Sequence, residues 1–132
     1  MLAFNLVWEV LQIPLYTFPT IPFRYYKAYS IIHCTIGDGM IASVLFAVTG
    51  LAIGWRWPVT APLRGLVLLL PLGVGYTAYS EWRNVYVLNA WTYDASMPTL
   101  WGIGLAPLAQ WLVTPLLATW IVTRNCTRKK LA

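Results

Sequence analysis

Charged residues are scarce in this chain of 132 residues: Asp, Glu, Lys and Arg make up 10% of it, whereas hydrophobic residues make up 59%. A soluble domain carries about 25% charged residues. This shortage excludes a water-exposed surface over most of the chain. It also excludes a nucleic-acid-binding surface, which would need an exposed basic groove. The missing charge is what a surface facing a lipid bilayer requires.

Histidine and cysteine are also rare, with one His and two Cys. Cys34 and Cys126 fall on opposite membrane sides in the topology derived below, so no disulfide is expected within one chain. No Glu-x-x-His or Cys-x-x-Cys pair is present, which argues against di-iron and zinc sites. Nor is there a nucleophile elbow, a Ser–His–Asp order or a glycine-rich phosphate loop. No motif therefore identifies a reaction or a cofactor.

Four long apolar segments are present, at residues 2–18, 31–54, 65–87 and 101–123. Each is close to the roughly 20 residues that a helix needs to cross a bilayer, and none alternates like the strand of a barrel. The first segment is not expected to be a cleaved signal peptide, because nothing basic precedes Arg24 and no small-residue cleavage site follows. We therefore predict an all-α fold, in which residues 1–132 form a single membrane domain, a four-helix bundle with four crossings.

Basic residues are distributed unequally between the two ends of these segments. Six Lys and Arg residues lie in the basic tail 124–132 and in the connection 55–64, and three lie at the opposite end. Because loops rich in Lys and Arg stay on the cytoplasmic side, both termini are predicted to be cytoplasmic. The predicted location is the bacterial inner membrane, with a multi-pass topology.

Proline and glycine interrupt the apolar segments. The prolines are Pro14, Pro71, Pro107 and Pro115. Proline removes a backbone donor from a helix, so we expect kinked helices. Gly50 and Gly54 form a GxxxG pattern, which permits close approach of another helix. The pattern does not distinguish a contact within the chain from a contact with a partner.

Three of the four acidic residues lie inside apolar segments: Glu9, Asp38 and Glu81. A carboxylate at the centre of a membrane helix costs roughly 2.5–3.5 kcal/mol on insertion, so we expect these groups to be paired or functional. Counted from the outer helix ends at about 1.5 Å per residue, they lie roughly 9–13 Å deep, whereas the inner halves carry almost no polar groups. We predict a polar intramembrane site in the periplasmic half, made of Glu9, Gln12, His33, Asp38, Glu81, Asn84 and Gln110.

Three interpretations of this polar site stay open. A hydrogen-bonded network could hold the helices together, with Arg83 as the charge partner of Glu81, Asp38 or Asp94. The excess of carboxylates could instead hold a cation, a metal or a proton, with His33, Asp38 and Glu81 as metal candidates. His33 and Glu81 could also form the acid/base pair of an enzyme acting on a lipid-soluble substrate.

The longest polar connection, residues 88–100, is rich in aromatic side chains. Trp91, Tyr93 and Asp94 precede Pro98 within it. Aromatic side chains concentrate at membrane interfaces, so we predict an aromatic cap over the polar site. This cap would be an interfacial belt, a lid, or a docking surface for a partner or an apolar molecule.

The stretches WEVLQIPLY, HCTIGDGMIA, YSEWRNVYVLNAWTYDASMP and GLAPLAQWLVTP resemble a group of small bacterial inner-membrane proteins with four crossings and an SEW-x-N … W-x-Y … MP pattern. The resemblance covers almost the whole chain, but it implies no activity. It implies that the polar positions belong to the pattern, and that Arg83 does not. The matching residues are Glu9, Gln12, His33, Asp38, Glu81, Trp82, Asn84, Trp91, Tyr93, Pro98, Gln110 and Trp111.

Small size, short connections, the GxxxG pattern and the aromatic cap together favour an accessory or binding subunit of a larger membrane complex. The expected partners are the lipid bilayer and other membrane protein subunits, with a cation or an apolar ligand at the polar site and no nucleic acid. A small cation-handling, metal-handling or transport protein is the first alternative. A membrane enzyme is the second, although an enzyme is less expected because no catalytic motif is present.

Overall fold

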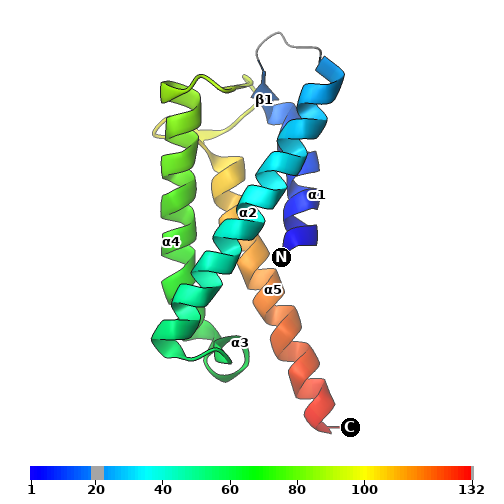
Figure 1. Ribbon diagram of the computed structural model, residues 1–132, viewed down its shortest axis with the longest axis vertical. Helices are drawn as coiled ribbons and strands as arrows, with labels where there is room; N and C mark the ends of the chain where they lie inside the picture. Colours follow the sequence, from blue (N-terminus) through cyan, green and yellow to red (C-terminus); the bar gives the residue numbers. More distant parts are fainter. Residues whose placement is uncertain (19–22, 132) are drawn as a thin grey trace.

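The computed structural model describes residues 1–18 and 23–131, and most of these are helical. The α-helices are α1 (Leu2–Gln12), α2 (Phe23–Ile53), α3 (Trp57–Thr60), α4 (Pro62–Trp82) and α5 (Leu105–Leu131). The long helices α2 and α4 each have one end near α3, α5 extends past α3 toward the C-terminus, and the short α1 lies beside α2 (Figure 1). Helix α5 continues through most of the predicted basic tail, of which residue 132 lies outside the described residues.

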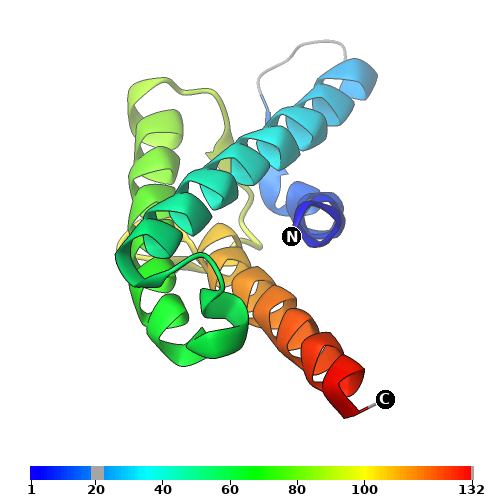
Figure 2. The ribbon, with the colours of Figure 1, turned by 60° about the horizontal axis from the view of Figure 1, so that its bottom comes forward.

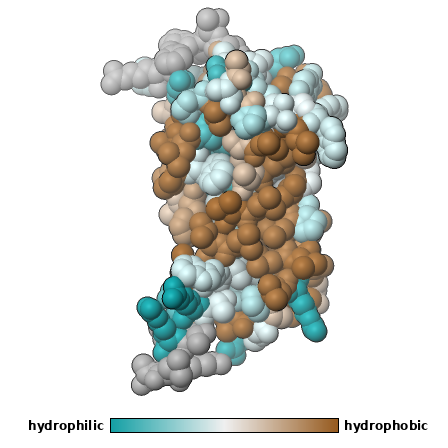
Figure 3. Space-filling view, turned by 180° about the vertical axis from the view of Figure 1, so that it is seen from behind, coloured by the Kyte–Doolittle hydropathy of each residue, from teal (hydrophilic) through white to brown (hydrophobic). Residues whose placement is uncertain are grey.

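Three helices are long and apolar enough to cross a membrane: Tyr25–Ile53, Pro62–Val87 and Leu105–Cys126. They correspond to the last three predicted crossings. Hydrophobic residues gather in a band across the middle of the molecule, and hydrophilic residues lie above and below it (Figure 3). These features are those of a multi-pass helical membrane protein.

The first apolar segment differs from its predicted crossing over residues 2–18. Helix α1 ends at Gln12, and a 3₁₀ turn (Ile13–Leu15) follows. The apolar helical stretch Leu2–Leu15 is about 20 Å long at 1.5 Å per residue, which is less than the roughly 30 Å of hydrocarbon in a bilayer. Pro14 lies in the 3₁₀ turn, where its missing backbone donor prevents the α-helix from continuing. A fourth crossing is therefore not confirmed.

Two short antiparallel strand pairs lie at one end of the molecule and depart from a purely helical fold. They are formed by β1 (Tyr16–Thr17) with β2 (Thr92–Tyr93), and by β3 (Thr99–Leu100) with β4 (Ile103–Gly104). Trp101 and Gly102 connect β3 to β4 with φ angles of 51° and 80°, and two positive φ angles are typical of a type I′ turn. We call this end, with its two strand pairs, the hairpin end, and the opposite end the α3 end.

The hydrophobic core lies toward the α3 end. Trp57 and Trp111 are each 2% exposed, and they belong to one cluster of buried apolar side chains from α2, α3, α4 and α5. The Thr123 hydroxyl donates a 2.8 Å hydrogen bond to the Pro58 carbonyl, which ties α5 to α3. The α3 end is therefore closed by side-chain packing.

The two glycines of the GxxxG pattern differ in their surroundings: Gly50 lies inside α2, whereas Gly54 follows its end with a φ angle of 97°, and a Cβ atom there would meet nothing within 4 Å. A Cβ atom on Gly50 would lie 2.8 Å from a ring carbon of Trp55. Because Gly50 has no side chain, the indole of Trp55 can pack against it. Pro71 and Pro115 lie inside α4 and α5, as expected, and the kinks stay a prediction.

Candidate functional site

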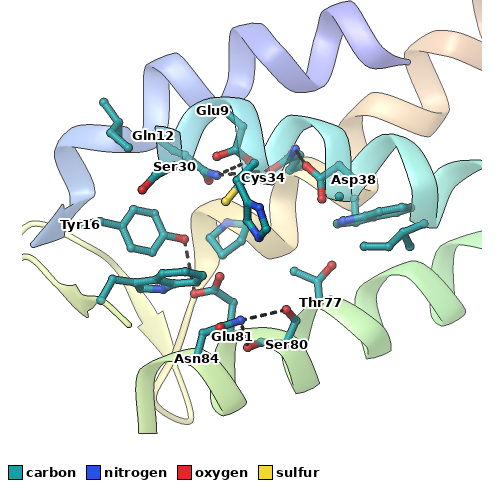
Figure 4. A pocket seen from close by; sticks show the side chains of 18 of the residues that line it. Glu9, Gln12, Tyr16, Ser30, Cys34, Asp38, Thr77, Ser80, Glu81 and Asn84 are labelled. Atoms are coloured by element: carbon teal, nitrogen blue, oxygen red, sulfur yellow. Dashed lines mark hydrogen bonds between the residues drawn. The ribbon is translucent and has the colours of Figure 1, made fainter. Parts of the chain in front are cut away.

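A cavity of about 220 Å³ lies among α1, α2, α4 and α5, in the half of the molecule next to the hairpin end (Figure 4). Its walls come from the end of α1, the first half of α2, the last part of α4 and the start of α5. All of the residues predicted for the polar site line this cavity: Glu9, Gln12, His33, Asp38, Glu81, Asn84 and Gln110.

Helical spacing explains how each helix supplies several of these groups. Residues three or four positions apart share a helix face, as Cys34 and Asp38 do on α2. Ser30 and Ser80 also line the cavity, although neither was predicted from the sequence. Ser30 lies four positions before Cys34, and Ser80 lies four positions before Asn84. The same helical spacing would therefore have predicted that both serines face the cavity.

A chain of hydrogen bonds links α1, α5 and α2 along the cavity. The Gln12 Nε2 atom donates to Glu9 Oε1 at 2.9 Å and to Gln110 Oε1 at 3.5 Å. The Gln110 Nε2 atom donates to Asp38 Oδ2 at 2.5 Å. Amide groups are neutral donors, so these bonds hold both carboxyl groups in place without supplying a positive charge.

Glu81 receives its hydrogen bonds from the strands at the hairpin end. Tyr93 donates its phenol proton to Glu81 Oε2 at 2.8 Å, and Tyr16 donates to the same oxygen at 3.4 Å. Tyr16 and Tyr93 are paired across β1 and β2, which explains why both phenols reach one carboxyl group. Burial, and the neighbouring Glu81 carboxylate, raise the pKa of Tyr93 above its ordinary value, so its phenol keeps the proton that it donates.

A π-helical turn (Arg83–Val87) begins two residues after Glu81, and the Leu88 N–H donates to the Arg83 carbonyl at 2.9 Å. Such turns are frequent at functional sites, because they shift the register of a helix. Asn84, within this turn, lines the cavity and donates its side-chain N–H to the Ser80 carbonyl at 2.8 Å. The turn thus places Asn84 beside Glu81 in the wall of the cavity.

Arg83 and Asp94 do not belong to the cavity. Arg83 is exposed, and among the described residues no acidic side chain forms an ion pair with it. Asp94 is also exposed, and its carboxylate accepts hydrogen bonds from the Ser96 backbone at 2.9 Å and the Ser96 hydroxyl at 2.8 Å. These bonds lower the pKa of Asp94. Of the predicted cap, Trp91 lines the cavity and Tyr93 holds Glu81, whereas Asp94 does not contribute.

The cavity combines carboxyl groups with aromatic walls. No Lys or Arg is among the described residues that line it. No three His, Cys, Asp or Glu side chains within residues 1–18 and 23–131 are grouped closely enough to hold a metal ion. The metal candidates His33, Asp38 and Glu81 therefore share the cavity without forming a set of ligands. The aromatic walls are formed by Tyr16, Phe18, Tyr76, Trp91 and Trp111.

Comparison with protein-family models, with curated proteins and with solved structures finds no match to this chain. The resemblance to a group of small inner-membrane proteins stays a prediction. The fold and the site define a helical protein with several candidate membrane spans and a carboxyl-lined cavity, and its function is inferred from the chemistry of that cavity.

Proposed function

We propose that the protein is a membrane-embedded binding protein whose cavity holds a small organic cation with an ammonium group. One observation carries this proposal: Glu9, Asp38 and Glu81 come from three helices into one cavity, and no Lys or Arg is among its described lining residues. At an effective dielectric constant of about 20, opposite charges 4 Å apart attract by about 4 kcal/mol. A cation in the cavity would therefore be held strongly.

The empty volume supports binding over a purely structural role. Protein interiors are close-packed, with few voids larger than a water molecule. The hydrogen bonds from Gln12, Gln110 and Tyr93 already hold the three carboxyl groups, yet a cavity of about 220 Å³ remains beside them. A network that served only to join the helices would need no such space.

The aromatic walls favour an organic cation over a metal ion. The ring faces of Trp and Tyr attract ammonium groups by about 0.5–2 kcal/mol each, and Trp91, Trp111 and Tyr76 all line the cavity. Hard metal cations such as Ca²⁺ instead need six to eight oxygen ligands at about 2.3–2.6 Å. The grouping of the described acidic side chains does not provide such a shell.

Neutralising one acid of the cavity is expected to weaken the binding of n-butylammonium by about tenfold or more, because tenfold corresponds to about 1.4 kcal/mol. Calorimetry on the purified protein in a maltoside detergent would compare wild type with Glu81→Gln and Asp38→Asn. Asp94→Asn is the matched control, because Asp94 is an exposed acid outside the cavity. The neutral analogue n-butanol is expected not to bind measurably.

Two results would overturn the proposed function. The first is the absence of n-butylammonium binding to the folded wild-type protein. The second is equal affinity for wild type, Glu81→Gln and Asp38→Asn. Circular dichroism of each variant would show that an altered affinity does not reflect loss of the fold.

We also propose that the α3 end and the C-terminal tail face the cytoplasm, which places the cavity in the periplasmic half of a bacterial inner membrane. The excess of Lys and Arg in the tail and in the connection 55–64 supports this orientation. A green fluorescent protein fused after Ala132 is expected to fluoresce, because this reporter folds in the cytoplasm. An alkaline phosphatase fused at the same position is expected to be inactive, and an active fusion would reverse the orientation.

The role as an accessory subunit of a larger complex stays a prediction. The GxxxG pattern does not add support, because Gly50 packs against Trp55 of the same chain and Gly54 lies beyond the end of α2. A binding protein that works alone and one that works within a complex would use the same cavity.

A further inference from the structure

We infer that the ligand is a single-chain amphiphile, whose ammonium head lies in the cavity while its hydrocarbon tail leaves between α2 and α4 into the membrane. This inference rests on the proposed binding of an organic cation, and it adds the class of the cation and its route of entry. The arrangement of α2 and α4, the exposure of the lining residues, and the size of the cavity each contribute to it.

Helices α2 and α4 form a V. They approach each other near α3 and diverge toward the hairpin end, as two views of the molecule show (Figures 1 and 2). Both helices line the cavity in this diverging half, through residues 30–41 of α2 and 76–81 of α4. Helices α1 and α5 supply Glu9, Gln12 and Gln110 as further walls (Figure 4).

The exposure of the lining residues locates the mouth between α2 and α4. Tyr76 on α4 is 48% exposed, and His33 on α2 is also exposed, although both line the cavity. By contrast, Glu9 and Gln110, from α1 and α5, are only 6% and 2% exposed. Tyr29 stacks on His33 with ring centroids 5.5 Å apart, so aromatic rings extend from the cavity onto the outer face of α2.

The surface around the mouth is apolar and belongs to the candidate membrane spans. Ile32 and Ile36 on α2 are 58% and 55% exposed, and Leu72 and Tyr79 on α4 are 48% and 56% exposed. These side chains would contact lipid in a protein embedded through Tyr25–Ile53 and Pro62–Val87. A ligand passing between the two helices would therefore come from the hydrocarbon region rather than from water.

The volume of the cavity matches a head group rather than a whole amphiphile. Pockets that enclose drug-sized molecules have volumes of about 300–1,000 Å³, and this cavity has about 220 Å³. A long hydrocarbon chain would not fit beside the ammonium group. It would remain in the bilayer, where its apolar surface stays out of water.

Two glycines provide a matched pair of variants that tests the mouth. Gly37 lies one turn after His33 and lines the cavity, whereas Gly75 on α4 does not. A Cβ atom on either glycine would meet nothing within 4 Å. Both substitutions Gly37→Leu and Gly75→Leu are therefore expected to fold, but only Gly37→Leu would place a larger side chain in the cavity wall on the α2 side.

Binding of n-butylammonium and n-dodecylammonium would be measured by tryptophan fluorescence, for wild type and both variants, at one concentration of maltoside micelles. We expect wild type to bind the dodecyl compound at least about tenfold more tightly than the butyl compound. Because Gly37 itself lines the cavity, the readout of the route is the affinity gained from the longer chain, and Gly37→Leu is expected to reduce this gain by about tenfold or more relative to wild type. Gly75→Leu should behave like wild type, which controls for partition of the ligand into the micelles.

The outcomes separate this inference from the proposed function. Binding of butylammonium with no gain from the longer chain would overturn the amphiphile and leave the organic-cation site in place. A gain from the longer chain that both leucine variants keep would overturn the route between α2 and α4. Failure of wild type to bind either amine would overturn the proposed function itself. The comparison of chain lengths in wild type needs no variant, so it stands even where Gly37→Leu does not fold.

Discussion

Replacing Trp57 by alanine is expected to lower the free energy of unfolding by about 3–5 kcal/mol, the usual cost of removing a buried Trp side chain. Trp57 is 2% exposed and belongs to the core cluster at the α3 end. Its indole packs against the backbone of α4 at Gly65. Truncation would leave a large void there, because the surrounding helices relax only partially.

Equilibrium unfolding by sodium dodecyl sulfate in mixed micelles, followed by circular dichroism, would measure this loss. Trp101→Ala is the matched control, because Trp101 is 94% exposed. A surface substitution usually changes stability by less than about 0.5 kcal/mol. Equal stability of Trp57→Ala and wild type would contradict the placement of this indole in the core.

The change Gly65→Ala is expected to cost about 1–3 kcal/mol, although alanine is the better helix former. A Cβ atom on Gly65 would overlap the ring of Trp57. That ring is itself buried, so it has little room to move. The steric cost would therefore exceed the gain in helix propensity.

Gly75→Ala is the matched control for this change, and it is expected to raise the free energy of unfolding rather than lower it. Its Cβ would meet nothing within 4 Å, so the helix should gain about 0.5–1 kcal/mol from alanine. The same unfolding assay would compare the two variants.

A double variant that combines Gly65→Ala with Trp57→Leu tests the contact between the two sites. Its loss in free energy of unfolding should be smaller than the sum of the losses of the two single variants, because the two sites are in contact. Additive losses would show that the clash does not exist.

These two stability predictions concern the α3 end, whereas the binding predictions concern the hairpin end. The apolar cluster around Trp57 and Leu69 closes the V of α2 and α4 at its vertex. The open half of the V contains Glu81 and Asp38 in the cavity wall. Packing at one end can thus hold the fold while the other end keeps space for a ligand.

The sequence predicted the membrane class and the polar half of the molecule from composition and spacing. Three of the predicted crossings correspond to helices that are long and apolar enough to cross a membrane, because apolar length is a local property of the chain. The residues predicted for the polar site all line one cavity, because depth along a helix and the face of a helix both follow from residue counting.

The first crossing and the charge partner could not be predicted in the same way. Hydropathy does not show that α1 ends at Gln12, because the apolar run continues past that residue while Pro14 changes the backbone. From charge alone, Arg83 was predicted to form an ion pair with an acid. In the structure, Glu81 instead accepts hydrogen bonds from two tyrosines. One of these, Tyr93, lies in a different part of the chain from Tyr16, and the β1–β2 pairing brings them together.

By itself, the sequence determined that this protein has helices long and apolar enough to cross a membrane, and that two of them carry an acid, Asp38 and Glu81. Only the tertiary structure decided that these acids share a cavity, and that its mouth lies between α2 and α4. The physical reason is that the position of a residue along a helix, and the side of the helix on which it lies, follow from that helix alone. A cavity also depends on the angle between neighbouring helices. Here α2 and α4 meet at the α3 end, where Trp57 packs against both Gly65 of α4 and the Phe46 ring of α2.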